Sequence, residues 1–138
     1  MSLPLLEVDD LSVDYASRRV WFRSGETKFR ALESVSLDIG ACEALGIVGE
    51  SGSGKSTLAR AVLRLIKPSA GQIRWKGQRL DTAAAPALHV MRRELQAVFQ
   101  DPFGSLDPRM TVLESVAEAL ESLQGLRERG KVRERVHA

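Results

Sequence analysis

The chain has 138 residues, 43% of them hydrophobic and 28% charged, which is typical of one globular domain or part of one and argues against a disordered or collagen-like chain. Its net charge of +2 provides no broad basic field, so we expect no nucleic-acid partner. Cys42 is the only cysteine, which excludes an intrachain disulfide, and we expect a buried, inert thiol. The longest uncharged apolar run, 44–48, is far too short to span a bilayer, so any membrane role would be peripheral.

The first part of the chain predicts antiparallel β-structure. Leu5–Tyr15 alternates in part between apolar and polar residues, and Ala31–Ile39 resumes this pattern before a turn at Gly40. Residues 17–28 have no periodicity and are predicted to be a loop or a hairpin insertion. A second, short hairpin is predicted at 71–78.

A strand, a glycine-rich loop and a helix are predicted to follow one another in the middle of the chain. The continuous apolar run 44–48 indicates a strand that is covered on both faces. Beyond the glycines, apolar residues from Leu58 to Ile66 fall at helical spacing, and Pro68 follows where a helix should have stopped.

The last part of the chain predicts a short helix at Ala87–Leu95, a strand at Gln96–Phe99 and a further helix. The further helix begins after Thr111, because Glu114 three residues later completes a capping box. The apolar residues that mark one face of this helix are Val112, Leu113, Val116, Leu120 and Leu123.

One segment has the composition of a phosphate-binding loop. Residues 49–56 match G-x-x-x-x-G-K-[ST] at every fixed position. Glycine lets such a loop wrap closely round phosphates while its N–H groups point at the anion, Lys55 reaches the β- and γ-phosphates, and Ser56 can ligate Mg²⁺. A serine-glycine linker is the alternative interpretation, but a linker would not lie between a buried strand and an amphipathic helix. The predicted ATP- and Mg²⁺-binding residues are Gly49, Glu50, Ser51, Gly52, Ser53, Gly54, Lys55, Ser56 and Thr57.

A phosphate loop alone does not distinguish kinases, small GTPases, DNA-repair ATPases and transporters. Residues 98–112 read Val-Phe-Gln-Asp-Pro-Phe-Gly-Ser-Leu-Asp-Pro-Arg-Met-Thr-Val, and with Val35–Ile39 and Pro68–Ile73 they resemble the ATP-binding subunits of ABC transporters that import peptides and nickel. This resemblance implies an α/β P-loop NTPase fold, an ABC-type ATPase core with an N-terminal antiparallel β subdomain. It places a partial core at 1–111 and the start of a helical subdomain at 112–138.

The resemblance also implies roles for single residues. Gln100 is similar to the Q-loop glutamine, which contacts Mg²⁺ and the attacking water and couples the nucleotide site to the membrane subunits. The alternative is a glutamine at a strand end that bonds local backbone. Tyr15 is the best positional match for the aromatic residue that stacks on adenine. Plain core packing is its alternative, and Trp21, Phe22 or Phe29 could take the stacking role instead.

By the same resemblance the protein would form a homo- or heterodimer with a second ATPase subunit. It would work with transmembrane permease subunits, as a peripheral protein on the cytoplasmic face of the inner membrane. The family also needs a signature motif, a Walker B strand and a switch histidine after Gln100. No such motif follows it here, so we expect the chain to be truncated and to turn ATP over slowly by itself.

Several stretches imitate the missing motifs without their context. Ser69–Gln72 resembles the signature and Leu5–Asp10 a Walker B strand, but both precede Gln100; His89 and His137 do not suit the switch position either. Two alternatives therefore stay open. One is a nucleotide-binding fragment without turnover that serves as an interaction or regulatory module. The other is an ABC-type DNA-repair ATPase, which would require a coiled-coil heptad where the apolar pattern breaks at Gly125.

Overall fold

The computed structural model describes residues 3–16, 28–101, 106–125 and 129–137. The chain divides into two compact units, Met1–Ala84 and Ala85–Ala138. The division that we predict between residues 111 and 112 separates family subdomains, and it stays a prediction.

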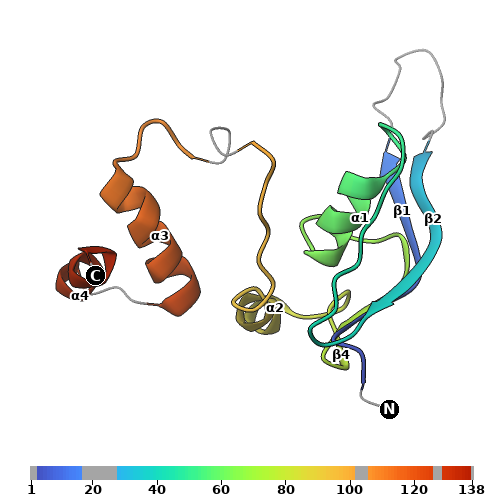
Figure 1. Cartoon of the computed structure of the whole chain (residues 1–138), viewed down its shortest axis with the longest axis horizontal. Helices are drawn as coiled ribbons and strands as arrows, with labels where there is room; N and C mark the ends of the chain where they lie inside the picture. Colours follow the sequence, from blue (N-terminus) through green and yellow to red (C-terminus); the bar gives the residue numbers. More distant parts are fainter. Residues whose placement is uncertain (1–2, 17–27, 102–105, 126–128, 138) are drawn as a thin grey trace. The chain divides into compact units, whose positions relative to one another are not determined.

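The described residues of the first unit form a four-stranded sheet with the strand order β2-β1-β3-β4 (Figure 1). The strands are β1 (Leu6–Ala16), β2 (Lys28–Ile39), β3 (Ala70–Trp75) and β4 (Gln78–Arg79). β1 pairs antiparallel with β2 on one side and with β3 on the other, and β3 pairs antiparallel with β4. The predicted antiparallel strands and the predicted second hairpin are confirmed. The insertion predicted at 17–28 lies outside the described residues except for Lys28, which begins β2.

Helix α1 (Lys55–Val62) packs on this sheet and closes the core (Figure 1). Leu58 and Ala61 lie three residues apart on its buried face. Burying a large aliphatic side chain stabilises the folded state by roughly 1.5–3 kcal/mol. A helix as short as α1 is marginally stable by itself, so its packing on the sheet stabilises it. The helix ends before the predicted Ile66, where Arg64 adopts a positive φ of 53°. The buried apolar side chains of the sheet and its turns are Leu6, Val8, Leu11, Val13, Leu32, Ile73 and Leu80.

A bulge in β1 requires glycine in the neighbouring strand. The pairing of β1 with β3 shifts register between Asp9 and Ser12, and Asp10 in the bulge has a φ of 48°. Gly71 in β3 faces this bulge with a φ of 86°. A Cβ atom at Gly71 would lie 2.3 Å from the carbonyl oxygen of Asp10 and 2.6 Å from the Cα of Leu11. Two backbones therefore meet here at a distance that only glycine permits.

Asp81 is a buried carboxylate that ties the β3–β4 hairpin to the turn after it. It accepts hydrogen bonds from the Arg79 Nε at 2.8 Å and from the Ile73 N–H at 3.0 Å. The bond from Arg79, with the backbone N–H of Ile73 as a smaller cause, lowers the pKa of Asp81 below its ordinary value of 3.8. The charged form of this carboxylate therefore stabilises the hairpin.

Two apolar segments that we predict as strands, 44–48 and 96–99, are not strands in the structure. Val48 is 94% exposed, and Val98 and Phe99 are exposed as well. Extended backbone becomes a strand only when a neighbouring strand pairs with its N–H and C=O groups. Within the described ranges no strand pairs with either segment, so both predictions are wrong for this chain.

The prediction for Cys42 is also wrong, because its thiol is exposed. Cys42 lies in the turn after β2 and has a positive φ of 60°. The Glu43 carboxylate fixes this turn by accepting the Gly40 N–H at 2.6 Å. A polar turn at the surface, rather than core packing, thus determines where the thiol lies.

The described part of the second unit is helical, with α2 (Ala85–Met91), α3 (Val112–Gln124) and α4 (Arg129–His137). The predicted capping box of α3 is confirmed: the Glu114 N–H donates to the Thr111 Oγ1 at 3.3 Å and the Thr111 N–H donates to the Glu114 Oε2 at 2.8 Å. Gly125 ends the helix in the left-handed conformation. No helix in the described part of the chain is long and apolar enough to cross a membrane.

Candidate functional site

The glycine loop and the first turn of α1 form one continuous backbone feature in the first unit. Gly52 and Gly54 have φ values of 84° and 96°, a conformation that other residues adopt only with strain. A Cβ atom at Gly54 would lie 2.7 Å from the Leu32 Cδ2 and 2.9 Å from the Ala31 carbonyl oxygen. At Gly49 it would lie 2.8 Å from the Ser53 Oγ. Gly54 is therefore required by the close approach of the loop to β2, and Gly52 by its backbone conformation.

The start of α1 is suited to bind an anion. Gly54 is its N-cap and supplies no side-chain hydrogen bond to the helix, and the first turn contains no acidic residue. The N–H groups of a first helical turn have no carbonyl partner within the helix, and the helix dipole gives this end a partial positive charge. Ser56 is exposed and Thr57 is half-buried in this turn. The arrangement is the usual one for phosphate binding at a helix N-terminus.

The Lys55 ammonium group is hydrogen-bonded to the loop. Its Nζ donates to the carbonyl oxygens of Gly49 at 2.7 Å and Glu50 at 2.6 Å, and to the Ser53 Oγ at 3.3 Å. These three acceptors hold a positive charge against the loop, beside the N-terminus of α1. The loop N–H groups, the N-terminus of α1 and the Lys55 charge would thus all attract an anion bound at the loop.

The residues that the structure provides also fit a magnesium ion held together with a nucleotide. The described residues contain no group of three or more histidine, cysteine, aspartate or glutamate side chains that could hold a metal. Mg²⁺ commonly binds through one or two protein ligands and the phosphates of a substrate, keeping several waters. The exposed Ser56 hydroxyl beside the loop can provide an oxygen ligand of this kind for Mg²⁺.

Tyr15 lies near the end of β1, in the same unit as the loop. It is 37% exposed and pairs directly with Phe29 of β2, which is 65% exposed. Val13, two residues earlier, pairs with Leu32, the residue against which Gly54 packs. Two strand residues span about 6.6 Å, so the aromatic pair is within a short distance of the loop along the ladder. Trp21 and Phe22, the other candidates for stacking, lie outside the described residues.

Gln100 belongs to the second unit, where it is exposed and outside every helix and strand. Its predicted contact with Mg²⁺ and the attacking water stays a prediction. His89 is exposed on α2, and the side chain of His137 lies outside the described part of the chain. The two stretches that imitate other motifs, Ser69–Gln72 and Leu5–Asp10, belong to the antiparallel sheet or its flanks.

Sequence reasoning did not single out the ion pair between Asp14 of β1 and Arg30 of β2, which stands next to Tyr15 and Phe29 in the ladder. The sequence contains part of the signal for this ion pair, because Asp14 directly precedes Tyr15 and Arg30 directly follows Phe29. Recognising the pair required the register between the strands, which is set across an insertion and cannot be read from either strand alone.

A loop with the pattern G-x-x-x-x-G-K-[ST] that leads into a helix, as residues 49–56 lead into α1, is typical of the P-loop class of nucleotide-binding proteins. The family profile for ABC transporters matches residues 32–138. The match covers most of the chain, and the chain belongs to the ABC transporter family.

Relatives and solved structures agree with this assignment. The chain is 45% identical over 117 residues to a glutathione import ATP-binding protein of Salmonella typhimurium, covering 85% of this chain and 19% of that protein. It is 46% identical over 123 residues to a putative peptide import ATP-binding protein of Brucella ovis, covering 89% and 36%. The chain thus spans about a fifth to a third of the length of these curated relatives.

Among solved structures, a dimeric ATP-binding cassette in a post-hydrolysis state, bound to ADP and Pi, superposes with a TM-score of 0.72 and 27% identity over 96% of this chain and 54% of that one. CbiO1 of Clostridium perfringens, part of an ABC transporter complex, has a TM-score of 0.67 and 26% identity over 99% and 49%. The predicted fold class and the predicted family are both confirmed.

Proposed function

We propose that this chain binds ATP or ADP, with Mg²⁺, through Gly49–Thr57. The position of the Lys55 ammonium group carries the proposal, because it lies against the loop carbonyls beside the N-terminus of α1. In this proposal the backbone N–H groups of the loop and of the first turn of α1 bind the phosphates, and Lys55 neutralises their β- and γ-oxygens. The Ser56 hydroxyl holds Mg²⁺, which bridges phosphate oxygens and offsets their charge.

The adenine base stacks on Tyr15. Its exposure, its place in the ladder two residues beyond Val13 and its pairing with Phe29 support this role. Stacking of a base on an aromatic ring is worth about 1–3 kcal/mol, so the aromatic end of the β1–β2 ladder contributes affinity that the phosphates alone do not provide.

We propose that the chain acts in the energy-coupling ATPase subunit of an importer for peptides or related solutes. The relatives, which are import ATP-binding proteins for glutathione and, putatively, for peptides, support this class of cargo. A second ATPase subunit and transmembrane permease subunits are its partners, and the dimeric solved cassette supports the first of these. Such a subunit lies on the cytoplasmic face of the membrane as a peripheral protein.

Gln100 is proposed to contact Mg²⁺ and the attacking water and to transmit the state of the nucleotide to the permease. Its match within residues 98–112 supports this assignment. Gln100→Ala is therefore expected to leave ADP affinity within about twofold while transport coupling in the longer protein is lost. A large loss of ADP affinity with normal coupled transport would contradict the role.

The binding proposal is tested by calorimetric titration of the 138-residue chain with Mg-ATP. Lys55→Ala is expected to weaken binding at least about tenfold, which corresponds to about 1.4 kcal/mol. The control is Lys67→Ala, which removes the same charge from an exposed position between α1 and β3 and is expected to change affinity less than about twofold. Equal affinity of the wild type and Lys55→Ala would refute the proposal.

A further inference from the structure

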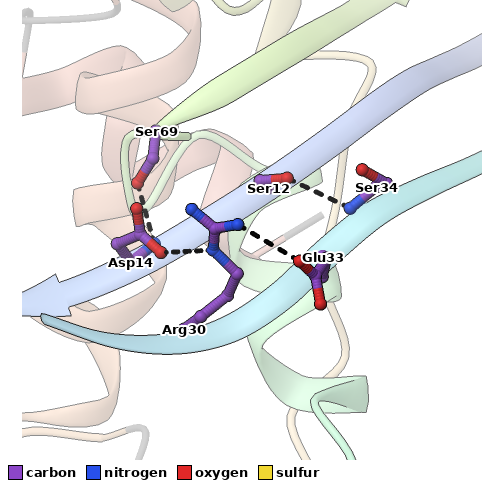
Figure 2. A network of polar contacts seen from close by, with 6 residues as sticks. All are labelled: Ser12, Asp14, Arg30, Glu33, Ser34 and Ser69. Carbon is purple, nitrogen blue, oxygen red and sulfur yellow. Dashed lines mark hydrogen bonds and ion pairs between the residues drawn. The ribbon is translucent and has the colours of Figure 1, made fainter.

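A network of polar contacts holds the end of β1 beside Tyr15 (Figure 2). Arg30 of β2 reaches across to β1, where its Nε donates to the Asp14 Oδ1 at 2.9 Å. Its Nη1 also donates to the Glu33 Oε1 at 3.2 Å. The side chain of Asp14 is only 17% exposed, whereas that of Arg30 is 53% exposed. The hydrogen bond from Arg30 lowers the pKa of the Asp14 carboxyl group, which therefore stays charged over the physiological range.

The other side of β1 is held at the same residue by Ser69. The ladder between β1 and β3 reaches its last pair at Ser12 and Ala70. Beyond it, the Ser69 N–H donates to the Ser12 carbonyl at 2.8 Å. The Asp14 N–H donates to the Ser69 Oγ at 2.8 Å (Figure 2). The serine hydroxyl thus accepts a bond that a further strand residue would otherwise accept. Asp14 is consequently fixed by its backbone on one side and by its side chain on the other.

The aromatic pair Tyr15 and Phe29 directly follows the pair Asp14 and Arg30 in the ladder between β1 and β2. Tyr15 is more than a third exposed, and Phe29 is exposed over most of its surface, although large aromatic residues are usually well buried. In the described residues the ladder continues for one more pair, Ala16 with Lys28. The ion pair is therefore the last charged cross-strand contact before the exposed rings.

We propose that Arg30, through Asp14, is a positioning residue that holds the Tyr15–Phe29 end of the ladder in the orientation that stacks on a nucleotide base. This inference rests on the proposed function, and it adds a determinant of base binding that is separate from the phosphate loop. Arg30 acts on the base through the strand and does not itself contact the phosphates. Ion pairs with a solvent-exposed partner such as Arg30 contribute little to global stability, so we expect Arg30 to affect the local order of the strand end rather than folding.

The test compares ATP with inorganic tripolyphosphate, which has the phosphates without the base, for variants of the whole 138-residue chain. Arg30→Ala is expected to weaken ATP binding about three- to tenfold, within the range of one base stack, and to change tripolyphosphate binding less than about twofold. Arg30→Lys, which keeps a charge within reach of Asp14, is expected to recover most of the loss.

Arg74→Ala is the matched control, because Arg74 of β3 makes a cross-strand pair with Glu7 of β1 at 3.6 Å at the opposite end of the same strand. It is expected to change neither affinity. Tyr15→Ala is expected to reduce ATP binding as Arg30→Ala does, and the double variant is expected to lose little more than either single one, because the two residues act as a unit.

Equal loss of ATP and tripolyphosphate affinity in Arg30→Ala would overturn the inference, because Arg30 would then act on the phosphates or the fold. Unchanged ATP affinity in Arg30→Ala, or additive losses with Tyr15→Ala, would overturn it as well. In each of these outcomes the phosphate-binding proposal still stands if Lys55→Ala weakens the binding of both ATP and tripolyphosphate. If Lys55→Ala leaves both ligands unaffected, the proposed function itself fails and the inference fails with it.

Discussion

Replacing Gly71 by alanine is expected to destabilise the sheet more than any ordinary glycine-to-alanine change. The new Cβ would lie 2.3 Å from the Asp10 carbonyl oxygen, and its other near contacts are also backbone atoms, so no flexible side chain can move aside. The left-handed conformation, with a φ of 86°, costs about 1–2 kcal/mol, and overpacking costs roughly 1–3 kcal/mol more. The smaller entropy of the unfolded chain offsets about 0.4–1 kcal/mol of this. We expect a net loss of about 3 kcal/mol.

Urea denaturation measures this loss. At a slope of about 1.5–2 kcal/mol per molar urea, the midpoint of Gly71→Ala should fall by about 1.5–2 M. Gly77→Ala is the control, because Gly77 has a similar φ of 75° but nothing within 4 Å of its Cβ position. That variant should lose about 1 kcal/mol, or about 0.5 M. Equal midpoints for the two variants would show that the close approach of β3 to the bulge of β1 is not present.

Three further predictions concern other parts of the chain. The contact with Arg79 lowers the pKa of Asp81, so the charged carboxylate stabilises the fold fully above the ordinary pKa of 3.8, and this stabilisation is lost as the pH falls through the lower pKa of the folded state. Below about pH 4 the urea midpoint should therefore fall less steeply with pH for Asp81→Asn than for the wild type. Parallel plots of midpoint against pH would contradict this. Thr111→Ala removes the capping box with Glu114 and should cost about 1 kcal/mol in α3, seen as about fivefold faster exchange of the hydrogen-bonded amides that follow its first turn; unchanged exchange would show that the box does not stabilise the helix. The chain by itself should release phosphate from ATP far more slowly than about 1 per second, whereas Lys55-dependent release near that rate would show that its catalytic groups are complete.

Local features could be predicted from the sequence because neighbours along the chain determine them. The capping box of Thr111 depends on a residue three positions later, and the glycine loop depends on a run of nine residues. Both were found where the sequence predicts them. The family was also accessible, because the match at residues 98–112 is a continuous stretch.

Features that depend on distant residues could not be predicted in the same way. The apolar run 44–48 has the composition of a buried strand, but a strand also needs a paired neighbour, which composition does not reveal. The contact of Gly71 with Asp10 depends on a bulge that shifts the register of β1, and the pairing of Asp14 with Arg30 depends on the register across residues 17–27. Periodicity indicates which residues face a core, and only pairing across the sheet brings such partners together.

The central claim is that the backbone of Gly49–Thr57 binds the phosphates of a nucleotide. The most direct measurement is the change in backbone amide chemical shifts when Mg-ADP is added to the uniformly ¹⁵N-labelled 138-residue chain. The account predicts that the largest changes fall on the amides of Gly49–Thr57, with smaller ones at Tyr15 and Phe29, and that Lys55→Ala reduces them all at the same nucleotide concentration. Changes that leave the loop amides in place and concentrate in α3 would contradict it.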